Sequence, residues 1–117
     1  MIFTDTENFF ARASAEKLPS REEEKALAKR MKNGDCAARE TLINGYLPMV
    51  ASLVLRGPEE IRTLHTVYSC ISELEAEVDT FNFMQEGESF VHHLSRRLRQ
   101  CITKCLASTL SKNVNKL

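Results

Sequence analysis

The chain contains 117 residues, 43% of them hydrophobic, and its 16 Lys and Arg residues balance its 16 Asp and Glu residues. A chain of this size buries roughly two thirds of its unfolded surface, so one domain can hold a core without metal or disulfide cross-links. The longest apolar run, Leu47 to Leu55, spans nine residues and contains Pro48, whereas a membrane-spanning helix needs about twenty. Collagen-like, disordered and membrane-spanning classes are therefore excluded.

The first residues of the chain and its cysteines indicate the cellular compartment in which we expect the protein. The first ten residues contain Asp5 and Glu7 but no Lys or Arg, unlike the basic start of a signal peptide. The four Cys residues have no framework spacing, which favours reduced thiols and a cytoplasmic location. Cys101 and Cys105 are one helical turn apart, and we expect core packing rather than metal binding there. No cofactor or metal is expected.

The net charge of zero hides an uneven distribution of charge. Residues 90–117 contain six basic residues and no acidic residue, whereas residues 1–89 contain ten basic and sixteen acidic residues, a net charge of −6. Such asymmetry suggests a C-terminal segment that faces a polyanion.

The first half of the chain predicts an N-terminal extension and three short helices. Residues 3–15 form either a helix packed on the domain or a segment that binds a partner. Ser20 and Glu23 have the spacing of a capping box, which predicts a helix over residues 21–33. Gly34 suits a left-handed turn and Asp35 an N-cap, which predicts a second helix to about residue 44. Pro48 is tolerated only in a first turn, which predicts a third helix over residues 46–56.

The second half predicts two longer helices. Glu59 and Glu60 suit the first turn of a fourth helix, because carboxylates complement the helix dipole. This helix would present one apolar stripe at steps of three and four residues: Ile61, Leu64, Val67, Ile71, Leu74, Val78 and Phe81. Ser89 would cap a fifth helix, followed by a frayed polar tail over residues 108–117.

The fifth predicted helix has two different faces. Its apolar residues lie within about 60° of Leu98 on a helical wheel: Val91, Leu94, Leu98, Cys101, Ile102 and Cys105. The opposite face holds basic and hydrogen-bonding side chains, with Arg97 and Arg99 on its flanks: His92, His93, Arg96, Gln100, Thr103 and Lys104. Since no segment alternates like a strand, the predicted class is all-α, a single compact bundle of about five helices over residues 1–117.

Two long segments resemble the conserved core, called region 2, of the bacterial RNA polymerase sigma-70 family. Residues 18–43 read LPSREEEKALAKRMKNGDCAARETLI, similar to the Glu-rich helix, Gly-Asp turn and Ala-rich helix of that family. Residues 90–104, which end with LRQCITK, are similar to its promoter-reading helix. The resemblance covers residues 18–105 in order, so residues 1–17 would be an N-terminal extension.

The resemblance implies a DNA contact on the fifth helix. Arg99, Gln100, Thr103 and Lys104 fall on retained positions and would contact duplex at the upstream edge of the minus-ten promoter element. His93, Arg96 and Arg97 stand where the family has a Tyr and two Trp residues, which stack on flipped bases. Arg and Lys suit phosphates, while Gln and Thr can bind base edges. The predicted DNA-binding set is therefore His93, Arg96, Arg97, Arg99, Gln100, Thr103 and Lys104.

The chain also departs from the family pattern. The family's polymerase-binding motif, Asp-Leu-Ile-Gln-Glu-Gly, is replaced by His65-Thr-Val-Tyr-Ser-Cys70, so its polar contacts to core RNA polymerase are missing. The loop before Phe90 is one residue longer. A length of 117 residues leaves no room for the family's C-terminal helix-turn-helix domain, which a partner protein would then supply.

Two functional hypotheses follow. The first is a sigma-like transcription regulatory module that contacts promoter DNA, RNA polymerase or both, and one form of this hypothesis is half of a split sigma factor. The second is a protein-interaction module on a degenerate sigma-like fold, without promoter melting. An enzyme is not expected, since the sequence contains neither a phosphate-binding glycine loop nor a nucleophile motif.

Overall fold

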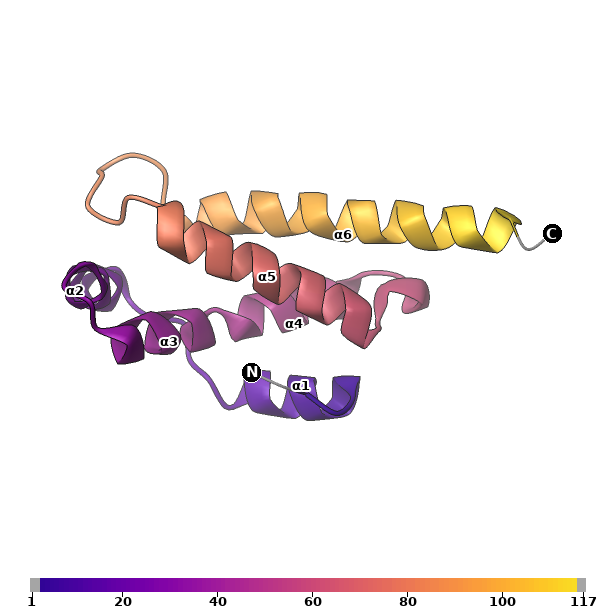
Figure 1. Cartoon of the computed structure of the whole chain (residues 1–117), viewed down its shortest axis with the longest axis horizontal. Helices are drawn as coiled ribbons and strands as arrows, with labels where there is room; N and C mark the ends of the chain where they lie inside the picture. Colours follow the sequence, from indigo (N-terminus) through magenta and orange to yellow (C-terminus); the bar gives the residue numbers. More distant parts are fainter. Residues whose placement is uncertain (1–2, 116–117) are drawn as a thin grey trace.

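The computed structural model describes residues 3–115, which fold into helices joined by short connections (Figure 1). The elements in chain order are α1 (Thr6–Ser14), α2 (Arg21–Lys32), α3 (Cys36–Gly45), α4 (Leu47–Arg56), the 3₁₀ turn η1 (Glu59–Ile61), α5 (Leu64–Thr80) and α6 (Phe90–Asn115). The structure is 76% helical and has no strand among the described residues. The predicted all-α bundle of about five helices is confirmed, with α1 as an additional N-terminal helix.

The helices pack in layers around one core. In Figure 1, α6 runs along one side of the molecule, α5 packs beneath it, and α3 and α4 follow one another below α5. Helix α2 packs against α3, and α1 lies against α4 on the side away from α6. The core unites residues from all six α-helices, with Tyr46, Phe9 and Phe90 among its largest fully buried side chains. None of the described helices has the length and apolar character needed to cross a membrane.

The predicted cap at the start of α2 and the predicted turn and cap between α2 and α3 are confirmed. Ser20 and Glu23 form a reciprocal capping box at the start of α2. Gly34 has a φ of 88°, a conformation that a Cβ atom would strain, and it turns the chain from α2 into α3. The Asp35 side chain then accepts a hydrogen bond from the Ala38 amide at 3.1 Å and caps α3.

The predicted start of the longest apolar stripe was wrong. Glu59 and Glu60 lie in the separate 3₁₀ turn η1, and α5 begins only at Leu64. The Thr63 hydroxyl caps α5 by accepting a hydrogen bond from the Thr66 amide. Ile61 is nevertheless fully buried. The apolar spacing therefore continues across the break between η1 and α5. Because the spacing is uninterrupted, periodicity alone could not locate that break.

Helix α6 is longer than predicted. It continues to Asn115 instead of fraying from about Ser108, and the end of the predicted tail, residues 116–117, lies outside the described residues. No Gly or Pro interrupts the sequence after Gly87, and the Thr109 hydroxyl donates to the Cys105 carbonyl within the helix. Val91, predicted to face the core, is instead exposed.

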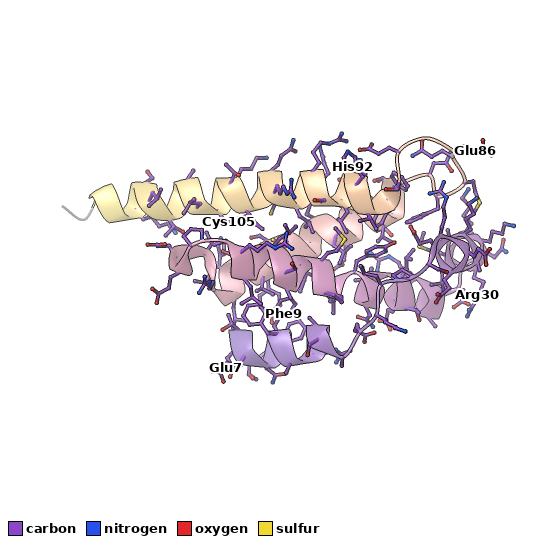
Figure 2. All side chains as sticks on the ribbon, turned by 180° about the vertical axis from the view of Figure 1, so that it is seen from behind. Glu7, Phe9, Arg30, Glu86, His92 and Cys105 are labelled. Atoms are coloured by element: carbon purple, nitrogen blue, oxygen red, sulfur yellow. The ribbon has the colours of Figure 1, made fainter. Side chains whose placement is uncertain are left out.

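The N-terminal segment packs on the domain as a helix. Phe9 of α1 is fully buried and points from α1 toward the bundle, whereas Glu7 points outward (Figure 2). The Phe3 amide donates to the Tyr68 hydroxyl at 2.8 Å, and that hydroxyl donates to the Phe3 carbonyl at 3.2 Å. Of the two alternatives for this segment, the packed helix is therefore observed.

Candidate nucleic-acid interface

A shallow groove of about 680 Å³ runs along the outward side of α6. It is lined by side chains of this helix alone, whose one-turn spacing brings them to one side: His92, Ser95, Arg96, Arg99, Gln100, Thr103 and Lys104. We call Arg96, Arg99, Gln100, Thr103 and Lys104 the outer face of α6. All five are exposed, and His92 at the same side points away from the bundle in Figure 2.

The outer face is positively charged because it holds Arg96, Arg99 and Lys104 and no acidic residue lines the groove. The acidic residue Glu73 lines a smaller groove with Gln100 and Lys104. Neither Arg99 nor Lys104 forms an ion pair with any residue of the described part of the chain. The Thr103 hydroxyl donates to the Arg99 carbonyl at 2.9 Å and keeps its oxygen available as an acceptor. The face thus offers two uncompensated cations, one amide and one hydroxyl.

Two predicted DNA-binding residues contact carboxylates of α5, although the Arg97 side chain remains 46% exposed. His93 Nε2 contacts the Glu77 carboxylate, and its side chain is only 21% exposed. Arg97 Nε donates to Glu77 at 3.1 Å and to Glu73 at 3.3 Å. The structure therefore brings five of the seven predicted residues together on the outer face, and holds His93 and Arg97 in contacts within the chain.

Arg96 occupies an intermediate position. Its guanidinium group reaches Glu88, in the loop before α6, at 3.2 Å, yet its side chain remains 53% exposed. Glu88 also lies 3.7 Å from a ring nitrogen of both His92 and His93. An exposed pair of this kind stabilises the fold by at most about 1 kcal/mol, so a stronger anionic ligand can compete for Arg96.

Glu77 is the anchor of this network. Its side chain is 9% exposed. Burial tends to raise the pKa of Glu77, but the hydrogen bonds from His93 and Arg97 outweigh it, and the pKa lies below its ordinary value of 4.5. Glu77 is therefore ionised at neutral pH and compensates the positive charge at this end of α6.

An aromatic cluster fixes the loop beside these residues. The Phe81 ring lies 5.2 Å from Phe83 and 5.0 Å from Phe90, between ring centres, and 5.1 Å from the His93 ring. Phe83 is buried and Phe81 partly buried. Both Phe residues therefore have a packing role, and His93 belongs to the same cluster.

Sequence reasoning missed the acidic partners of the basic helix. Glu73 and Glu77 are four residues apart and fall on one face of α5, so their spacing was available as a signal. Their alignment with Arg97 depends on the antiparallel packing of α5 and α6, which the charge pattern of a single helix does not reveal.

Residues 65–70 lie in the first turns of α5. Thr66, Val67 and Cys70 are buried there, while His65 and Tyr68 are exposed. Burial raises the pKa of the Cys70 thiol above its ordinary value, so this thiol stays protonated. Cys105 is buried as well, and Cys101 packs against the core, as expected for packing residues.

Comparisons with known proteins found no matching family model, no matching curated protein and no matching solved structure.

Proposed function

We propose that the protein is a sigma-like transcription regulatory module that contacts nucleic acid through the outer face of α6. The observation that carries this proposal is the exposed cluster of Arg99, Gln100, Thr103 and Lys104, whose common groove has no acidic lining residue. These are the positions at which the sequence resembles the promoter-reading helix of the sigma-70 family. Promoter DNA of the minus-ten type is the proposed ligand.

The side chains of the outer face have distinct proposed roles. Arg99 and Lys104 bind backbone phosphates, because both are uncompensated cations. Gln100 and Thr103 contact base edges, since an amide can bind adenine through two hydrogen bonds and the Thr103 hydroxyl oxygen can accept one. Arg96 joins them when phosphate displaces Glu88. A partner protein with a helix-turn-helix domain would complete promoter recognition, and polymerase contact would use surfaces other than the missing motif.

The test is a fluorescence-anisotropy titration of the purified chain with labelled duplex and single-stranded minus-ten oligonucleotides, at low and near-physiological salt. We expect saturable binding that weakens steeply with salt, because bound phosphates release counterions. Lys104→Ala should weaken binding to every sequence, whereas Gln100→Ala should cost about 1–3 kcal/mol on preferred sites only. Lys29→Ala, an exposed lysine of α2, is the matched control. Absence of binding at low salt would contradict the proposal.

A protein-interaction module is the second candidate function. An apolar groove of about 410 Å³ lies between α1 and α4. Phe10, Pro48 and Leu55 line it, and Leu55 is 49% exposed. Binding of a protein here would be insensitive to salt, which distinguishes this function from phosphate binding.

A further inference from the structure

A second, smaller groove of about 170 Å³ lies between α4 and α6. Its lining combines two arginines, two serines and two apolar side chains: Met49, Ser52, Leu53, Arg56, Ser95 and Arg99. No acidic residue is among them. Sequence reasoning gave Arg56 no functional role, since it lies more than forty positions from Arg99 in the chain.

The charges in this groove are unbalanced. Four other arginines, two of them also on α6, form ion pairs with nearby carboxylates: Arg30, Arg39, Arg96 and Arg97. Arg56 and Arg99 form none within the described part of the chain, a property that they share with Arg12, Arg21 and Arg62. Arg56 and Arg99 differ from these three because they line the same groove. Two guanidinium groups that line one groove repel each other unless an anion lies near them, so the groove favours an anionic ligand.

The groove is continuous with the outer face of α6. Ser95 and Arg99 line both this groove and the larger groove along α6. A nucleic-acid strand bound to the outer face would therefore meet Arg99 at the border and could continue toward Arg56. The serine hydroxyls add hydrogen-bond donors suited to phosphate oxygens.

We propose that Arg56 on α4 is a further phosphate-binding residue, which together with Arg99 binds the backbone of the nucleic-acid strand held on the outer face of α6. The inference rests on the proposed function and extends it from one helix to two. A phosphodiester is favoured over an acidic protein segment because the groove is joined to a face that also offers Gln100 and Thr103, groups suited to base edges.

The experiment compares Arg56→Ala with wild type by anisotropy, using a labelled duplex of about twenty base pairs over a series of salt concentrations. Loss of one phosphate contact should lower the slope of log affinity against log salt by about 0.9 and weaken binding about 3- to 10-fold at low salt. Arg56→Lys should restore most of the slope, because it keeps the charge. Circular dichroism and thermal unfolding of each variant establish that its fold is retained.

Arg12→Ala is the matched control. Arg12 is exposed and lies in the last turn of α1, as Arg56 lies in the last turn of α4, but it lines neither groove. Equal slopes for Arg56→Ala and Arg12→Ala, with Lys104→Ala still defective, would overturn the inference and leave the proposed function intact. No binding by wild type would overturn both. Tighter binding of polyglutamate than of the duplex would overturn the phosphodiester ligand in favour of an acidic protein.

Discussion

Arg97 on α6 donates a hydrogen bond from Nε to the Glu77 carboxylate on α5 at 3.1 Å. Glu77 also contacts His93, so one buried carboxylate holds two basic residues of the helix that the sequence predicts to bind DNA. This arrangement separates the charge of α6 into a compensated part near its start and an uncompensated part around Arg99 and Lys104. We therefore expect the compensated part to contribute to the stability of the fold and the uncompensated part to contribute to ligand affinity.

Glu77→Gln should destabilise the fold at neutral pH by about 1–2 kcal/mol, because His93 and Arg97 lose their anionic partner. The pKa of Glu77 is lower in the folded chain than its ordinary value of 4.5. Its stabilising contribution is therefore fully present above about pH 4.5 and is lost as the pH falls through the folded-state pKa. Urea unfolding at pH 7 and at pH 3 should show that the difference between wild type and Glu77→Gln shrinks in acid.

The control for this measurement is Glu86→Gln. Glu86 is exposed in the loop before α6 and forms no ion pair in the described part of the chain (Figure 2). It should leave the free energy of unfolding unchanged at both pH values. A Glu77→Gln variant as stable as Glu86→Gln at pH 7 would show that the contacts of Glu77 are energetically neutral.

Arg97→Ala and Arg99→Ala should differ in their effects on DNA affinity. Arg99 is uncompensated on the outer face, and its loss should weaken duplex binding about 3- to 10-fold at low salt, as expected for one phosphate contact. Arg97 already has carboxylate partners, so its loss should change affinity less than twofold. Anisotropy titrations of the two variants provide the comparison. A larger defect for Arg97→Ala would mean that DNA displaces Glu77 and that Arg97 is a direct contact.

Local sequence signals predicted the elements far better than the contacts between them. The capping box at Ser20, the glycine turn at Gly34 and the cap at Asp35 are short-range features, and each was found where the sequence placed it. The break at Arg62 and Thr63 was missed because Ile61 keeps its core position from a 3₁₀ turn. A periodic apolar pattern reports burial and does not require a continuous helix.

In the candidate site, too, the local features were predicted and the contacts between helices were not. The outward position of Gln100, Thr103 and Lys104 follows from helical spacing relative to Leu98, and the structure places them so. Arg99 lies on the flank of that face, as Arg97 does, and the structure places Arg99 in the same groove. The inward contacts of His93 and Arg97, and the approach of Arg56 to Arg99, depend on which helices become neighbours. That information lies in the packing of α4 and α5 against α6, and no single helical wheel contains it.

Tyr68→Phe should loosen the N-terminal segment. The Tyr68 hydroxyl makes both hydrogen bonds that hold the Phe3 backbone, and their loss should cost about 1–2 kcal/mol of folding stability. Hydrogen exchange of the amides in α1 should become faster, since this helix would open more often. His65→Ala, an exposed change one turn earlier on α5, is the control. Unchanged exchange in α1 would show that the burial of Phe9 alone holds the segment.

Tyr46→Phe should leave the fold as stable or make it more stable by up to about 1 kcal/mol. The Tyr46 side chain is fully buried, and its hydroxyl has no hydrogen-bond partner among the described residues. A buried hydroxyl without a partner loses its hydration without compensation. Phe keeps the ring that packs against Phe90 at 4.8 Å between ring centres, so urea unfolding should detect only the removal of the hydroxyl.

The carboxyl group of Glu24 is the neighbouring group against which the prediction for Tyr46 can be tested. Burial raises the pKa of Glu24, and burial together with the neighbouring Glu24 carboxyl group raises the pKa of Tyr46. A loss of more than about 1 kcal/mol in Tyr46→Phe would therefore reveal a hydrogen bond between the two side chains. A double-mutant cycle with Glu24→Gln measures that coupling directly. Additive effects of the two changes would establish that the Tyr46 hydroxyl is unpaired and that its burial opposes folding.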